Sequence, residues 1–220
     1  MIIYTILTPK SPKEKSFTIP IEFGGPTTPV LRGLRFGSGE RWAVLVHDEG
    51  RDLDAWRPLT GWLADHDFSV LAFDLPGHGA SDDPWLRALA CPSVVAAVEF
   101  ARSEGARHVN LIGAGLGALA VLAAAAQDSC DPASITALSP KVDDRVAALA
   151  DVREARVPKL ILVGSLDGDA VEDAKAVYRS AIGPCELTEF PVAAQGAELM
   201  SGEWGDHARE KLLANLVRGS

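Results

Sequence analysis

Side chains that could do acid–base or nucleophilic chemistry follow several short apolar runs of this 220-residue chain. His47 ends one run, His78 lies in a turn after the next, and Ser139 and Ser165 follow two later runs. A hydroxyl activated by an imidazole can attack a carbonyl, so these residues are candidates for hydrolytic chemistry. The sequence places no histidine beside either serine, and turn histidines are more often hydrogen-bonded structural groups than catalysts. Both interpretations stay open.

The glycine-rich segment Gly113-Ala114-Gly115-Leu116-Gly117 stands between an apolar run and an alanine-rich stretch. The run predicts a strand over 108–112 and the stretch predicts a helix over 116–126. This is the strand–turn–helix context of the nucleophile elbow G-x-S-x-G, in which the central serine attacks the substrate. Gly115 occupies that central position and has no side chain, so the sequence predicts an elbow without its nucleophile.

Two other interpretations of the glycines and acids carry less weight. The spacing of Gly113, Gly115 and Ala118 also fits a dinucleotide-binding fingerprint, which gives a remote alternative of an oxidoreductase. That fingerprint belongs on the first strand of its unit, whereas these residues lie mid-chain. Asp48, Glu49, Asp52 and Asp54 could hold a cation, but a solvated loop before a helix is the commoner reason for such acids. We therefore expect no metal and no cofactor.

Composition narrows the classes of partner. The formal net charge of −9 argues against a nucleic acid or an anionic membrane as the partner. Cys91, Cys130 and Cys185 show no metal-binding spacing and are expected to be free thiols in a reducing compartment, which favours a cytoplasmic location. No apolar run approaches membrane-spanning length.

Apolar and amphipathic segments predict one α/β domain over residues 1–220, with antiparallel strands within 1–40 and an α/β core over 41–220. Alternating strands and helices indicate a doubly wound, mostly parallel sheet of about eight strands without a large cap domain. Ligands bind such sheets beyond the carboxyl ends of the strands. The predicted strands cover 16–23, 29–36, 41–47, 68–75, 108–112, 135–139, 159–164 and 186–191; the predicted helices cover 54–66, 93–104, 116–126, 142–150, 170–182 and 206–217.

From about Arg41 onward the chain resembles the α/β-hydrolase superfamily, because several family landmarks occur in order. Residues 44–47 resemble the strand that leads into the oxyanion-hole loop. Residues 73–82, Phe-Asp-Leu-Pro-Gly-His-Gly-Ala-Ser-Asp, closely match the turn after the next strand and are the most specific match. Residues 160–167 resemble the strand that delivers the catalytic acid, and residues 189–199 resemble the loop with the catalytic histidine.

This resemblance implies that Gly115, Asp167 and Gln195 stand at the positions of the nucleophile, acid and base. Only Asp167 is of the catalytic type, because glycine cannot attack and glutamine cannot act as a general base near neutral pH. The oxyanion-hole positions are Asp48, Glu49 and the backbone N–H of Leu116. The family usually has glycine where this chain has Asp48, and two carboxylates there would repel a developing oxyanion.

The sequence thus favours a hydrolase-fold protein that has lost Ser-His-Asp catalysis and binds a small molecule or a protein partner at the former active site. The alternative is an esterase-like hydrolase that uses relocated residues such as His47, His78, Ser139 or Ser165. The expected cleft comprises His47, Asp48, Ala114, Gly115, Leu116, Ser139, Asp167 and Gln195.

Overall fold

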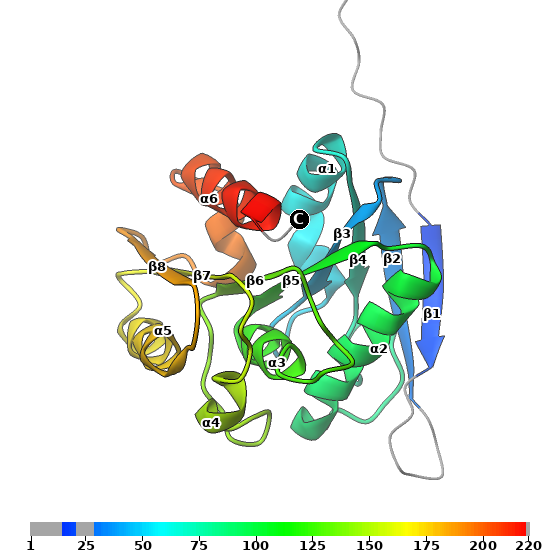
Figure 1. Ribbon diagram of the computed structural model, residues 1–220, viewed down its shortest axis with the longest axis horizontal. Helices are drawn as coiled ribbons and strands as arrows, with labels where there is room; N and C mark the ends of the chain where they lie inside the picture. Colours follow the sequence, from blue (N-terminus) through cyan, green and yellow to red (C-terminus); the bar gives the residue numbers. More distant parts are fainter. Residues whose placement is uncertain (1–14, 21–28, 219–220) are drawn as a thin grey trace, which may run out of the picture.

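A computed structural model describes residues 15–20 and 29–218 and contains one eight-stranded sheet (Figure 1). The strand order is β1-β2-β4-β3-β5-β6-β7-β8. β2 runs antiparallel to both β1 and β4, whereas the other neighbours pair in parallel. The strands are β1 (Lys15–Pro20), β2 (Val30–Phe36), β3 (Arg41–Val46), β4 (Phe68–Phe73), β5 (His108–Ala114), β6 (Ser134–Leu138), β7 (Lys159–Gly164) and β8 (Cys185–Phe190).

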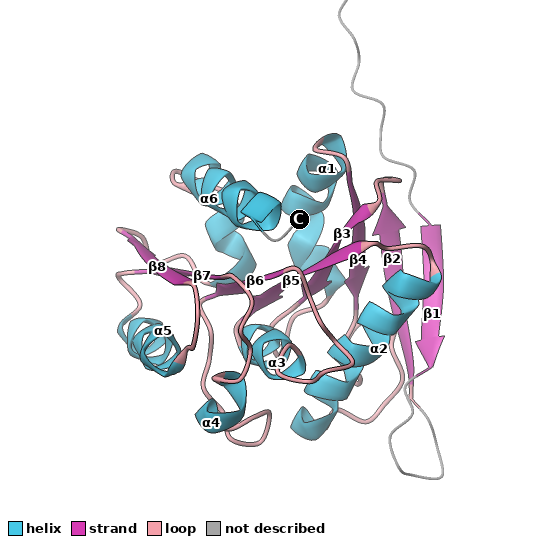
Figure 2. Cartoon of the chain, in the orientation of Figure 1, coloured by secondary structure: helices cyan, strands magenta, loops and turns pink. Residues whose placement is uncertain are grey.

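Helices cover both faces of the sheet (Figure 2). The helices α1 and α6 pack on one face, and α2, α3, α4 and α5 pack on the other. The α-helices are α1 (Arg57–Asp65), α2 (Ala90–Ser103), α3 (Leu116–Ala124), α4 (Leu149–Val152), α5 (Gly168–Ser180) and α6 (Gly205–Arg218). Three short 3-10 helices, η1 (Leu53–Trp56), η2 (Arg87–Leu89) and η3 (Gly196–Met200), lie in the connections. The doubly wound α/β fold predicted from the sequence is therefore confirmed.

The central strands are apolar on both sides because both of their faces are covered. In β3, Val44 and Val46 join the apolar core beneath α2 and α3, while Ala43 and Leu45 join the core beneath α1 and α6. The alternation follows from the two-residue period of a strand. The alanine-rich α3 is buried at every position, so its small side chains let it lie close to the sheet.

The predicted helix over 142–150 is wrong. The structure has an irregular loop there and only the four-residue α4 at 149–152. The loop has a single turn, in which the carbonyl of Asp143 accepts from Val146 and Ala147. Side chains hold the rest: Asp173 accepts from the backbone N–H of Val142, and Asp143 accepts from the backbone and side chain of Arg145. No large cap domain is inserted between β6 and β7. Residues 21–23 of the first predicted strand lie outside the described residues.

Within the described residues, no helix is long and apolar enough to cross a membrane.

Asp74 joins two loops at the carboxyl edge of the sheet. Its side chain is 2% exposed, and its two carboxylate oxygens accept from different backbone N–H groups, Leu53 at 2.8 Å and Ala80 at 2.9 Å. A Cβ at Gly79 would collide with this carboxylate, so the close turn requires a glycine there. Asp74 thereby fixes the loops after β3 and β4 relative to each other.

We predict that Asp74→Asn lowers the free energy of unfolding by about 1–3 kcal/mol, because the buried amide can accept only one of the two bonds and turns its NH2 group toward the other backbone N–H. Urea unfolding monitored by circular dichroism measures the change. Asp65→Asn, at an exposed position at the end of α1, is the matched control and should change stability by less than about 0.5 kcal/mol. Equal stability of the two variants would contradict this role for Asp74.

Candidate functional site: a hydrolase-type cleft

Gly115 forms a sharp turn between β5 and α3. Its backbone angles are φ 55° and ψ −119°, a left-handed conformation that costs any residue with a Cβ. The turn is locked on both sides, because the N–H of Gly115 donates to the carbonyl of Leu138 at 3.0 Å and its carbonyl accepts from the N–H of Lys141 at 3.1 Å. The chain therefore keeps the backbone geometry of an elbow at a position without a side chain.

The carboxylate of Asp48 fills the space where a side chain at position 115 would lie. A Cβ built on Gly115 would meet all three carboxylate atoms of Asp48 well inside the 3.0 Å that real Cβ contacts keep. Asp48 Oδ1 accepts from the backbone N–H of Leu116 at 2.8 Å and from that of Glu49 at 2.8 Å. Both N–H groups stand at the oxyanion-hole positions that the sequence predicts, and an internal carboxylate accepts from them.

The prediction that both Asp48 and Glu49 direct carboxylates at this hole is wrong for Glu49. The Glu49 carboxylate instead accepts from Trp85 Nε1 at 2.6 Å and pairs with Arg87. Burial raises the pKa of Glu49, but the hydrogen bonds from Trp85 and Arg87 and the charge of Arg87 together hold it below its ordinary value. The prediction fails because Arg87, far along the sequence, is a stronger partner for the Glu49 carboxylate than the start of α3, where the Asp48 carboxylate already lies.

Arg87 also reaches Asp143, so one guanidinium ties the loop after β3 to the loop after β6. Hydrogen bonding from Arg145 lowers the pKa of Asp143 to about 2, with further contributions from the charges of Arg145 and Arg87. The network fixes the backbone of Glu49 and with it the position of its neighbour Asp48.

Asp167 and Gln195 meet at the side of Gly115. The Gln195 amide nitrogen donates to Asp167 Oδ2. Asp167 also begins α5, where its Oδ1 accepts from the N–H of Ala170 at 3.4 Å. Gly115, Asp167 and Gln195 line one pocket, as the sequence predicts. The Gln195 amide can hydrogen-bond to Asp167, but it cannot take up and release a proton as a general base does.

The two turn histidines have no free ring nitrogen. His47 Nε2 accepts from the N–H of Leu75 at 2.9 Å, so its Nδ1–H donates to the carbonyl of Asp48 at 2.7 Å. Burial lowers the pKa of His47. His78 Nε2 accepts from the N–H of Gly50 at 3.1 Å and its Nδ1–H donates to the carbonyl of Pro76 at 3.0 Å. Both imidazoles hold loops in place.

The two candidate serines differ in their surroundings. Ser139 is 6% exposed, lines the cleft, and has a positive φ of 44°. Its Oγ accepts from the N–H of Gly196 at 3.0 Å. Ser165 is exposed, and its backbone N–H donates to the carbonyl of Phe190. Among the described residues, no histidine contacts either hydroxyl.

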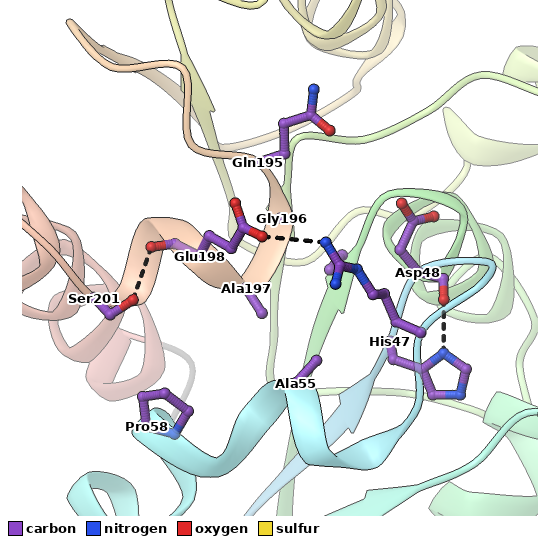
Figure 3. Close-up of a pocket in the computed structure, with 11 residues that line it drawn as sticks. His47, Asp48, Ala55, Pro58, Gln195, Gly196, Ala197, Glu198 and Ser201 are labelled. Carbon is purple, nitrogen blue, oxygen red and sulfur yellow. Dashed lines mark hydrogen bonds and ion pairs between the residues drawn. The ribbon is translucent and has the colours of Figure 1, made fainter. Parts of the chain in front are cut away.

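The cleft has two compartments that share Asp48, Gln195 and Gly196. Figure 3 shows the first, the Arg51 pocket, where Asp48 and Gln195 extend the same way from their loops. It encloses about 690 Å³ with its mouth; the second, the Lys141 pocket, encloses about 660 Å³. The Arg51 pocket is lined by His47, Asp48, Arg51, Ala55, Pro58, Ala114, Gln195, Gly196, Ala197, Glu198 and Ser201. The Lys141 pocket is lined by Asp48, Gly115, Ser139, Pro140, Lys141, Asp167, Asp169, Ala170, Asp173, Gln195 and Gly196.

Sequence reasoning missed the ion pair that crosses the Arg51 pocket. Arg51 pairs with Glu198 at 3.2 Å, joining the loop after β3 to η3. The two residues are 147 positions apart, and no motif marks either one. The predicted cleft residue Leu116 lies below the surface and contributes its backbone N–H, which Asp48 already takes.

The acids of the loop after β3 form no metal centre in the structure. Asp52 caps η1 and Asp54 pairs with Arg57. Among the residues that the structure describes, no group of three or more His, Cys, Asp or Glu side chains could hold a metal ion. The start of α3, where a dinucleotide would place its phosphates, holds the Asp48 carboxylate.

Residues 43–215 match the model of a protein family described as the alpha/beta hydrolase family. The chain belongs to this family. The match covers the elbow, the Asp48 loop and the Asp167–Gln195 pair. A comparison with curated proteins finds no match.

Solved structures of similar fold include several hydrolases. The chain superposes on a monoacylglycerol lipase of Paleococcus ferrophilus with a TM-score of 0.71 and 19% identity, covering 86% of this chain and 99% of the lipase. For a Pyrococcus furiosus esterase the TM-score is 0.76, the identity 18% and the coverage 97% and 96%. For an enol-lactonase of Burkholderia xenovorans the values are 0.71, 16%, 86% and 97%. At these identities the likeness concerns the fold alone.

We predict that Gly115→Ser destabilises the protein by about 1–3 kcal/mol, because its Cβ requires a strained φ and collides with Asp48. The same change in an Asp48→Gly background should cost less, since the collision is then absent. A double-mutant cycle by urea unfolding measures this coupling, which we expect to reach about 1 kcal/mol. Additive effects of the two changes would contradict the placement of Asp48 over Gly115.

The Asp143 network predicts a pH dependence of stability. The pKa of Asp143 is lower in the folded than in the unfolded state, so the unfolded state binds more protons and stability falls with acidification. The contribution is complete above about pH 4 and lost toward about pH 2. The free energy of unfolding should therefore fall less steeply between pH 4 and 2 in Asp143→Asn than in the native protein. Parallel slopes would exclude this role.

Proposed function

We propose that this alpha/beta hydrolase binds a small molecule in the cleft around Asp48 and does not carry out Ser-His-Asp acyl transfer. One observation carries the proposal: the Asp48 carboxylate takes the backbone N–H groups of Leu116 and Glu49 and fills the space above Gly115. Acyl transfer requires those donors for the developing oxyanion and a nucleophile in that space.

Three further features support binding without this chemistry. Gln195 occupies the position of the base and donates to Asp167, and neither turn histidine offers a free nitrogen to take its role. The two compartments share Asp48, Gln195 and Gly196, so one small molecule can contact both at the point where the Asp48 carboxylate lies. Their walls come from ordered loops pinned by ion pairs, so a ligand would meet a preformed surface.

Hydrolysis by relocated groups is the second candidate, favoured by neighbours of similar fold that are named as an esterase, a lipase and a lactonase. Ser139 is its best nucleophile, because it is buried beside the cleft and held at a positive φ, a strain that often accompanies function. This candidate requires a base that the described contacts of Ser139 do not provide.

We predict that the purified protein hydrolyses p-nitrophenyl acetate and butyrate at the background rate and gains no mass on incubation with a fluorophosphonate. Intact-protein mass spectrometry and a Ser139→Ala control read this out. Turnover or a stoichiometric adduct that disappears in Ser139→Ala would overturn the proposal and identify the second candidate as correct.

A variant designed to restore catalysis tests the same proposal. The combined variant Asp48→Gly, Gly115→Ser and Gln195→His restores a nucleophile, a base and free oxyanion donors, so it should hydrolyse p-nitrophenyl acetate above background. The matched control is Gly115→Ser with Gln195→His but with Asp48 retained, which should stay inactive because the carboxylate still blocks the donors. Equal activity of these two variants would show that Asp48 is not the blocking group.

A further inference from the structure

The carboxylate of Asp48 is fixed at one oxygen and free at the other. Both backbone donors, Leu116 and Glu49, use Oδ1. Among the described residues, none donates a hydrogen bond to Oδ2. Asp48 also lines both compartments of the cleft. A ligand in the cleft therefore meets an acceptor whose direction is set by the backbone.

Two of the donors near Asp48 are used within the protein. The amide nitrogen of Gln195 donates to Asp167, which leaves the Gln195 carbonyl oxygen for a ligand. The backbone N–H of Gly196 donates to Ser139 Oγ. The junction of the two compartments thus offers two acceptors, Asp48 Oδ2 and the Gln195 carbonyl oxygen, beside the Ser139 hydroxyl, which can still donate.

The charged side chains that line the cleft are mostly negative, like the Asp48 carboxylate. Five carboxylates line the two compartments against two cationic side chains; the Arg51–Glu198 pair cancels, which leaves four carboxylates against Lys141. Burial lowers the pKa of His47, so that imidazole adds no positive charge near neutral pH. The field of such a cleft attracts cations and repels anions. The five are Asp48, Asp167, Asp169, Asp173 and Glu198.

We infer that the cleft recognises an organic ammonium ion, with the ammonium group on Asp48 Oδ2 and the Gln195 carbonyl and the hydrocarbon part along the small apolar side chains of the Arg51 pocket. An ammonium group carries three donors and no acceptor, so it can donate to both of these oxygens. A carboxylate or a neutral ester would leave acceptors facing acceptors, which costs affinity. The inference rests on the ligand-binding function proposed above and names the chemistry of its ligand. The apolar side chains are Ala55, Pro58, Ala114 and Ala197.

The test is isothermal titration calorimetry of the 220-residue chain with n-butylammonium chloride, with sodium butyrate and 1-butanol as matched probes at the same ionic strength. The ammonium ion alone should bind. Asp48→Asn keeps an oxygen for the two backbone donors and should weaken binding at least about tenfold, the scale of one charge-assisted hydrogen bond. Asp65→Asn removes one exposed carboxylate elsewhere and should leave the affinity unchanged. Lys141→Gln removes a competing cation and should strengthen binding.

The outcomes separate this inference from the proposed function. Absence of butylammonium binding, or equal affinity in Asp48→Asn and native protein, overturns the ammonium inference. Preferential binding of butyrate or 1-butanol at the cleft overturns it too, while leaving a ligand-binding function in place. Ester turnover that depends on cleft residues would instead overturn the proposed function. Unfolding temperatures measured beside each titration show whether a variant has retained the fold.

Discussion

The site depends on one contact, in which the carboxylate of Asp48 accepts the first backbone N–H of α3. A helix begins with unpaired N–H groups and a partial positive charge, and Gly115 has no side chain to satisfy either. Asp48, 68 positions away, supplies both a hydrogen-bond acceptor and a negative charge. The glycine and the aspartate are two parts of one arrangement, since the missing side chain leaves the room that the carboxylate fills.

The surrounding elements serve this contact. The parallel pairing of β3 with β5 brings the Asp48 loop beside the start of α3. Asp74 fixes the far end of that loop at Leu53, and Glu49 anchors its near end through Trp85 and Arg87. Hydrogen bonds to His47 and His78 close the remaining freedom of the turns. Together these contacts hold the Asp48 carboxylate, which is bound to backbone N–H groups, at the centre of the cleft.

The fold is well predicted because the patterns that mark its strands and turns lie within short stretches of sequence. The two-residue alternation of β3 predicts which side chains face each core, and the glycine at position 115 predicts the sharp turn. The predicted helix over 142–150 does not form, because contacts with Arg87 and Asp173, which lie outside the segment, outweigh its apolar spacing.

The site is only partly predictable because its decisive contacts join distant segments. Family order brings Gly115, Asp167 and Gln195 to one pocket, and the unusual aspartate after His47 signals a changed oxyanion loop. Nothing local indicates that Glu49 turns away toward Arg87, or that Arg51 reaches Glu198. Those choices depend on competition between partners that become neighbours only in the folded chain.

His47 has a consequence beyond its hydrogen bonds. It is the only imidazole among the residues that line the two compartments, and burial favours its neutral form. A histidine that gains and loses its proton near neutral pH changes the charge beside a bound molecule as the pH changes. Here the ring is a fixed spacer between two backbone groups. A molecule entering this cleft would therefore meet an uncharged His47 ring in a mildly acidic compartment as well as in a mildly alkaline one.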